Sequence, residues 1–120
     1  MKVAITSQGR EMTSPLDRRF GRAAFFVVAD TETGEFTAHD NGQNLNAAQG
    51  AGIQAGGNVA GLGVEAVITG NVGPKAYSVL KAAGVRIYLA PDGTVAETLQ
   101  RFKDGLLKES LSANVEGHWM

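Results

Sequence analysis

The sequence predicts a single α/β domain, and three observations lead to this fold class. Short runs rich in β-branched residues, typical of strands, are separated first by a turn and then by segments with helical periodicity. The 120 residues, 43% of them hydrophobic, suffice for one buried core but not for a second independent domain. Three strands followed by alternating helices and strands are typical of a mixed sheet with helices on both faces.

The five expected strands are short apolar runs bounded by turn residues. They cover residues 2–7, 25–29, 35–39, 65–69 and 85–89. The turn at 31–34 is short, so the second and third strands are expected to form an antiparallel hairpin. Helical segments join the first, fourth and fifth strands, which are therefore expected to be parallel.

Three helices are expected. The first, residues 47–62, contains or adjoins five glycines, each of which weakens a helix interior by roughly 0.5–1 kcal/mol relative to alanine. We therefore expect tertiary packing to hold it, very close to the sheet. The second runs over 74–83, with Pro74 in its first turn and Gly84 closing it. The third begins at a capping box, Thr94 to Glu97, and its apolar positions repeat through Leu106.

The domain is expected to cover residues 1–109, because periodicity is weak from 110 to 120 and predicts a flexible tail there. The apolar run at the N-terminus is shorter than a signal-peptide core, and no stretch approaches 18 apolar residues. The sequence therefore predicts a soluble, cytoplasmic protein that does not bind a membrane.

Charge and cysteine content exclude several functions. A net charge of −1 lacks the basic excess typical of nucleic-acid binders. The sequence contains no cysteine, which excludes a disulfide, a thiolate zinc site, a cysteine nucleophile and cysteine-ligated iron–sulfur clusters.

The loop that follows the first strand is a candidate anion site. It is long for an ordered loop, and four of the six arginines fall in it: Arg10, Arg18, Arg19 and Arg22. Guanidinium groups present fixed forks of donors that suit an anion with several acceptor atoms. The alternative is that these are solvated surface charges, some of them paired with Glu11 and Asp17.

The turn after the fourth strand offers backbone donors instead of charge. Gly70 and Gly73 let the main chain approach a ligand, and Pro74 starts a helix whose N-terminus carries roughly half a positive charge. Neither a Walker loop nor a dinucleotide-binding fingerprint is present. The alternative is an ordinary strand-to-helix turn made of common turn residues. Parallel strands place this turn and the arginine loop at the same edge of the sheet.

No catalytic constellation can be assembled from the sequence. His39 next to Asp40 is typical of a surface pair at a strand end, and His39 is a weak metal-ligand candidate. Paired carboxylates for acid–base or two-metal chemistry would have to come from Asp30 and Asp40. We therefore expect no enzyme activity.

Three motifs resemble those of the dinitrogenase iron–molybdenum cofactor biosynthesis family, in particular its small single-domain members. They are Phe20-Gly21-Arg22-Ala23 leading into the second strand, residues 49–55 (QGAGIQA), and residues 67–76 (VITGNVGPKA). The similarity spans about residues 2–102. Many relatives carry a histidine just before the second motif's Gly-x-Gly, where this chain has Gln49.

The resemblance implies a three-layer ribonuclease-H-like α/β domain with a five-stranded sheet in the order 3-2-1-4-5. It also implies binding, carrying or assembly of anionic metal–sulfur clusters. The matching family motif positions are Phe20, Gly21, Arg22, Gly50, Gly52, Gly70, Asn71 and Gly73.

Without a thiolate, a cluster would have to carry its own sulfides. The hypothesis is non-covalent capture of a molybdenum–sulfide cluster, with or without copper, or of an iron–molybdenum cofactor precursor. Arg18, Arg19 and Arg22 would neutralise it, and the N–H groups around Gly50–Gly52 and Gly70–Gly73 would donate to its sulfides, as would the side chains of Gln49 and Asn71. Proteins that supply or accept the cluster would be its partners. The alternatives are a small metal-dependent hydrolase or nuclease of the same fold and an organic-phosphate-binding module.

Overall fold

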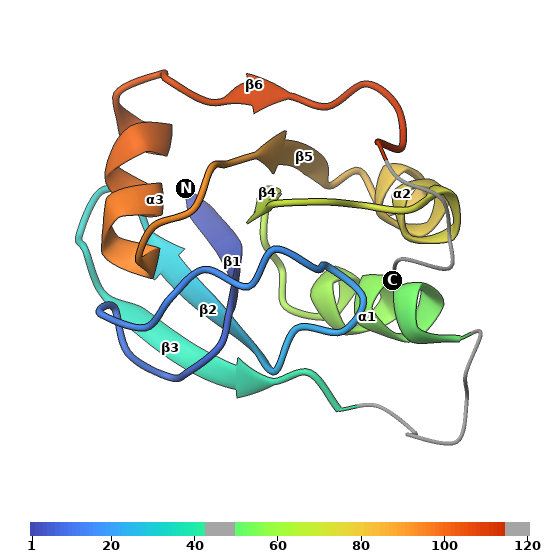
Figure 1. Ribbon diagram of the computed structural model, residues 1–120, viewed down its shortest axis with the longest axis horizontal. Helices are drawn as coiled ribbons and strands as arrows, with labels where there is room; N and C mark the ends of the chain where they lie inside the picture. Colours follow the sequence, from blue (N-terminus) through green and yellow to red (C-terminus); the bar gives the residue numbers. More distant parts are fainter. Residues whose placement is uncertain (43–49, 115–120) are drawn as a thin grey trace.

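The computed structural model describes residues 1–42 and 50–114 (Figure 1). Six strands and three helices follow one another in these ranges: β1 (Lys2–Ser7), β2 (Phe25–Asp30), β3 (Phe36–Asp40), α1 (Ala51–Ala60), β4 (Ala66–Thr69), α2 (Pro74–Ala82), β5 (Arg86–Leu89), α3 (Val95–Lys103) and β6 (Lys108–Glu109). The predicted elements are therefore present with small shifts in their ends. Residues 47–49 of the first predicted helix lie outside the described residues.

The strands form one mixed sheet in the order β3-β2-β1-β4-β5-β6. β2 pairs antiparallel with β1 and β3, whereas β1, β4 and β5 are parallel, as predicted. The expectation of five strands is wrong: β6 adds a sixth at the edge, antiparallel to β5, with Tyr88 opposite Glu109. Its two residues are polar and exposed, so no apolar pattern marks them in the sequence.

Helices cover both faces of the sheet, which gives three layers (Figure 1). α1 and α2 pack on one face, over a core that includes Ala4, Phe26 and Val67. α3 packs on the other face, where Val95 and Leu99 meet Ile5 and Ile68. Neighbouring strand residues alternate between the two cores, as the pleat of a strand requires.

The glycines of α1 serve helix packing more than close contact with the sheet. A Cβ at Gly52 would lie 3.3 Å from the Cβ of Ala76, and one at Gly56 only 2.8 Å from Cγ1 of Val79. Both neighbours belong to α2, so the expectation of a close approach to the sheet needs correction. The glycines instead let α1 and α2 lie against each other.

The prediction that the third helix continues through Leu106 is wrong. α3 ends at Lys103, and Gly105 adopts a φ of 73°, which favours glycine. The N–H of Gly105 donates to Phe102 and that of Leu106 to Arg101, the pattern of a Schellman motif. Leu106 is 69% exposed as a result.

In the described part of the chain, no helix is both long enough and apolar enough to cross a membrane.

Candidate anion-binding site

The loop after β1 is ordered by buried hydrogen bonds at the carboxyl ends of the parallel strands. The Thr6 hydroxyl donates to the Asp17 carbonyl at 2.6 Å and lies 2.9 Å from the Thr69 hydroxyl of β4. The N–H of Leu16 donates to Gly93 at 2.8 Å, which fixes the loop to the turn before α3. The long loop is therefore part of the folded edge.

The arginine loop directly contacts the turn after β4. Arg19 and Asn71 form a parallel bridge, and the N–H of Phe20 donates to the Asn71 carbonyl at 3.2 Å. The Asn71 side chain donates to the Arg18 carbonyl at 3.2 Å. The two segments singled out in the sequence thus form one surface.

Two helix N-termini meet beside this surface. Gly52 lies in the first turn of α1 and Ala76 in the first turn of α2, and a Cβ at Gly52 would be 3.5 Å from the Ala76 nitrogen. The first N–H groups of a helix lack acceptors within the helix and carry partial positive charge. Gly50 and Gly73, the N-cap residues, have no side chain that could satisfy them. The first turns of the two helices, with Gly52 in one and Ala76 in the other, are therefore candidate backbone donors for an anion.

The cationic side chains at this edge are exposed and partly paired with acids. Arg18 Nη1 lies 3.0 Å from Asp92 Oδ1, and Arg19 Nε lies 3.6 Å from Asp17 Oδ1. Asp17 is itself 5% exposed, and its Oδ1 accepts from the Arg19 N–H at 3.0 Å. Arg22 is exposed as well. The Arg18–Asp92 pair is exposed on both sides and therefore contributes little, whereas Arg19 faces a buried carboxylate.

Two of the predicted site residues are structural anchors. Phe20 is fully buried, with its ring centroid 5.7 Å from that of Phe26, and it belongs to the core under α1 and α2. Gly21 is buried next to it. Phe20 anchors the arginine loop in the core, and its buried side chain is not exposed to a ligand. Gln49 lies outside the described residues.

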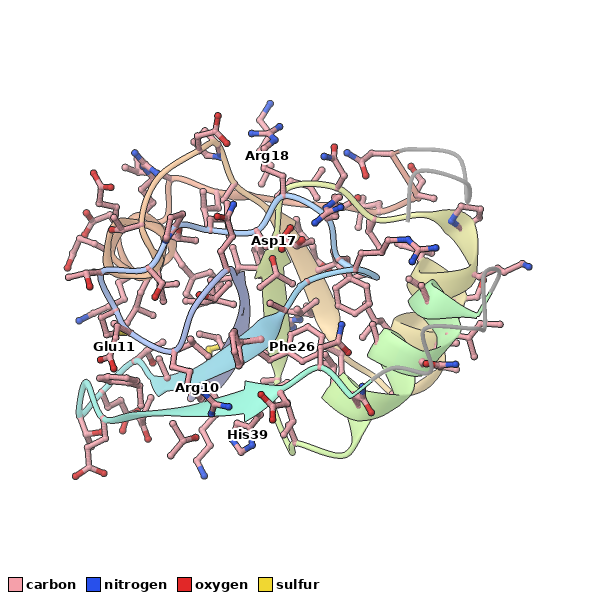
Figure 2. The ribbon with its side chains drawn as sticks, turned by 60° about the horizontal axis from the view of Figure 1, so that its bottom comes forward. Arg10, Glu11, Asp17, Arg18, Phe26 and His39 are labelled. Carbon is pink, nitrogen blue, oxygen red and sulfur yellow. The ribbon has the colours of Figure 1, made fainter. Side chains whose placement is uncertain are left out.

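Arg10 and His39 lie away from this surface. Figure 2 shows both beside β3 and Arg18 on the other side of the view. Arg10 pairs with Asp40 at 2.8 Å and stacks over the Phe25 ring at 4.6 Å. His39 Nε2 is 2.9 Å from the Thr37 hydroxyl. Arg10 is therefore not part of the candidate site, whereas Arg18 and Arg19 lie next to the turn after β4.

Sequence reasoning missed two residues here. Asp92 could have been found, because it follows β5 and the carboxyl ends of neighbouring parallel strands share one edge. Asn114 could not, because nothing in the pattern of the chain marks it. Its side-chain Oδ1 accepts from the Val72 N–H at 2.7 Å, and its Nδ2 donates to Asn71 Oδ1 at 3.2 Å.

The donor set suits an anion better than a bare cation. Within residues 1–42 and 50–114, no three His, Cys, Asp or Glu side chains come together as they would around a metal ion. Guanidinium and N–H groups dominate the edge instead. Fold and site together define a small three-layer α/β protein with a candidate anion-binding edge.

The comparisons with known proteins agree with this class. Residues 1–105 match the family described as "Dinitrogenase iron-molybdenum cofactor", and the chain belongs to that family. It is 33% identical to an uncharacterised protein of Methanocaldococcus jannaschii over 91% of both chains.

Two solved structures are similar along nearly the whole chain. The apo form of the orange protein from Desulfovibrio gigas is 39% identical, with a TM-score of 0.90 over 95% of this chain and 96% of that one. A candidate NifB protein from Thermotoga is 34% identical, with a TM-score of 0.78 over 96% of this chain and 97% of that one. The family resemblance seen in the sequence is thereby confirmed.

Proposed function

We propose that this protein binds and carries an anionic molybdenum–sulfide cluster without covalent bonds to it. The cluster is taken up with or without copper, or as a precursor of an iron–molybdenum cofactor. The observation that carries the proposal is the meeting of the α1 and α2 N-termini beside the Arg18–Arg22 loop.

Each part of this edge has a role in holding such a cluster. Arg18, Arg19 and Arg22 neutralise its charge, because guanidinium groups stay ionised and donate in fixed forks. Backbone N–H groups of the first turns, from Gly50–Gly52 and from Gly73 onward, donate to its sulfides. Asn71 adds a side-chain donor, since its NH₂ group has a second hydrogen besides the one given to Arg18.

The family supports a cluster as the ligand. It is described by the iron–molybdenum cofactor of dinitrogenase, and the orange protein of Desulfovibrio gigas is described in an apo form, which implies that it takes a ligand. A cluster that carries its own sulfides needs no thiolate from the protein, and this sequence has none to give. Charge and hydrogen bonds are what remain for recognition.

The site holds and releases its ligand, and we assign it no catalytic residue. The arginines and N–H groups can stabilise a bound anion, but none of them is a nucleophile or is placed as a general base. The role is therefore storage or delivery, with cluster-donating or cluster-accepting proteins as partners.

The proposal is tested by titrating the protein with tetrathiomolybdate, alone and with Cu(I), and following charge-transfer absorption. The Arg18, Arg19, Arg22→Ala triple variant should bind at least about tenfold more weakly, a loss of about 1.4 kcal/mol. The control variant Lys2, Arg86, Lys103→Ala removes three positive charges from the opposite edge, where β1 and β5 begin and α3 ends. It should bind like the wild type apart from a small, salt-sensitive change.

Equal binding by the wild type and the arginine triple variant would contradict the proposed roles. A competition arm with inorganic phosphate and a nucleoside phosphate addresses the organic-phosphate alternative. If these compounds displace tetrathiomolybdate at equal concentration, the site is a general phosphate site and the cluster proposal fails.

A further inference from the structure

The chain after α3 returns to the candidate site. Residues 106–120 lie beyond the family match, yet β6 pairs with β5 and the Ser110 N–H donates to Ile87 at 2.7 Å. Four residues further on, the Asn114 N–H donates to the Val72 carbonyl at 3.0 Å. Residues 108–114 therefore form a strap, from the sheet edge to the turn before α2.

A relay of two side-chain amides connects the end of this strap to the arginine loop. The Val72 N–H donates to Asn114 Oδ1 at 2.7 Å, and Asn114 Nδ2 donates to Asn71 Oδ1 at 3.2 Å. Asn71 Nδ2 in turn donates to the Arg18 carbonyl at 3.2 Å. Two hydrogen bonds thus link Asn114 to Arg18 through Asn71, and the third anchors Asn114 to Val72 in the turn after β4.

The backbone groups at the two ends of the relay, the Val72 N–H and the Arg18 carbonyl, determine which atom donates in each hydrogen bond. A backbone N–H can only donate, so Asn114 must turn its oxygen to Val72 and its NH₂ group to Asn71. Asn71 must then accept with its oxygen and donate with its nitrogen. The relay ends on a carbonyl, which can only accept, so both ends require the same orientation of the two amides.

We propose that Asn114 is a positioning residue of the candidate cluster site, acting on the arginine loop through Asn71. The proposal rests on the proposed function for the ligand, but its structural part concerns the protein alone. The strap holds Asn71 in one orientation, and Asn71 holds the backbone of Arg18, the first of the three arginines assigned to the cluster.

The relay also determines which backbone N–H groups near the turn remain available to a ligand. The Val72 N–H is occupied by Asn114, so it is not available to a cluster while the strap is in place. The donors left to the ligand come from the first turn of α2, where Lys75 and Ala76 follow Pro74, and from Gly52 in the first turn of α1. The strap thus makes the turn a support for the arginines.

Amide hydrogen exchange of the ligand-free, full-length protein tests the relay. Asn114→Ala should speed exchange at Val72 and also at Phe20, whose N–H is held by the Asn71 carbonyl, by at least about tenfold. Asn114→Asp can still accept from Val72 but meets Asn71 Oδ1 with an oxygen, so it should leave Val72 protected and still loosen Phe20. Ser112→Ala is the matched control, because no hydrogen bond of this strap uses the Ser112 hydroxyl, and it should change neither rate.

Tetrathiomolybdate titration then tests the effect on the site. Asn114→Ala should weaken binding about three- to tenfold and leave the salt dependence as it is, because no charge is removed. Unchanged exchange at Phe20 in both Asn114 variants would overturn the proposal, as would looser Phe20 exchange with wild-type affinity. A wild type that binds no tetrathiomolybdate overturns the proposed function instead, and the exchange at Phe20 still decides whether the relay exists.

Discussion

Gly70 lies against the backbone of Arg18 so closely that a Cβ at Gly70 would be 2.8 Å from the Cα and Cβ of Arg18 and 2.9 Å from its carbonyl oxygen. Real Cβ atoms are essentially never found at such distances. Its φ is not among the positive values, so space and not backbone conformation requires the glycine here. The contact joins the end of β4 to the arginine loop.

Gly70→Ala should therefore destabilise the fold and disturb the site together. The opposing atoms are mostly backbone and cannot rotate away, so we expect a loss of about 1–3 kcal/mol in the free energy of unfolding, measured by urea denaturation. Tetrathiomolybdate affinity should fall as well, because the arginine loop must move. Gly42→Ala, where a Cβ meets nothing within 4 Å, is the control and should stay within about 0.5 kcal/mol of the wild type. A stable Gly70→Ala protein with normal affinity would show that the two segments are not in contact.

Two adjacent glycines of α1 should respond to alanine in opposite directions. A Cβ at Gly56 would be 2.8 Å from Cγ1 and 2.9 Å from Cβ of Val79, whose branched side chain cannot turn aside easily. We expect Gly56→Ala to lower the free energy of unfolding by about 1–3 kcal/mol. Gly57→Ala, exposed with nothing within 4 Å, should raise it by about 0.5–1 kcal/mol, because alanine is the better helix former. Thermal and urea unfolding of the pair measure this, and equal shifts would contradict the observed α1–α2 packing.

The capping box of α3 should make stability depend on pH. The Thr94 N–H donates to Glu97 Oε1 at 2.9 Å and, with the Thr94 side chain, lowers the pKa of Glu97 from its ordinary 4.5. A lowered folded-state pKa stabilises the protein above the unfolded pKa, and this contribution is lost as pH falls through the folded value. The stability advantage of the wild type over Glu97→Gln should therefore be larger at pH 7 than at pH 3. Urea unfolding at both pH values checks this, with Thr94→Ser, which keeps the capping hydroxyl, as the control. An advantage that grows toward pH 3 would contradict the sign.

Local patterns in the sequence predicted most of the fold. The capping box at Thr94 and the glycine stop at Gly84 depend on residues within one helix turn, so they can be recognised without knowing the tertiary structure. β6 could not be predicted, because two exposed polar residues become a strand only where β5 offers an unpaired edge. The same holds for Leu106, where the apolar period continues but the chain has already turned at Gly105.

Part of the candidate site could likewise be predicted from the sequence, and part of it could not. The meeting of the arginine loop and the turn after β4 followed from parallel strand order, which places Arg18 and Asn71 at one edge. Strand order places Asp92 at the same edge, but its pairing with Arg18, 74 residues away in sequence, was not predicted. The contact between Asn114 and Asn71, 43 residues apart, was not predicted either, because no pattern in the sequence marks Asn114. Such contacts depend on how loops fold over the edge, which hydrophobic periodicity does not encode.

The ion pair between Arg18 and Asp92 should weaken anion binding, because Asp92 competes for the guanidinium. Arg18 Nη1 lies 3.0 Å from Asp92 Oδ1, and both side chains are exposed, at 47% and 82%. An exposed pair contributes about 0–1 kcal/mol, so Asp92→Asn should change the stability little. The Asp92→Asn variant should bind tetrathiomolybdate about two- to fivefold more tightly than the wild type in dilute salt. This gain in affinity should disappear near 1 M salt, where charges are screened beyond about 3 Å.

Asp104→Asn, which makes the same charge change at the far end of α3, is the matched control for this measurement. Its tetrathiomolybdate affinity should stay near that of the wild type, because Asp104 caps the C-terminal end of α3 whereas Asp92 precedes the N-terminal end. Equal gains from the two variants would mean that net charge alone acts on the anion. Weaker binding by Asp92→Asn would mean that Asp92 holds Arg18 in its binding position. Only a gain confined to Asp92→Asn and sensitive to salt agrees with competition between the carboxylate and the cluster for Arg18.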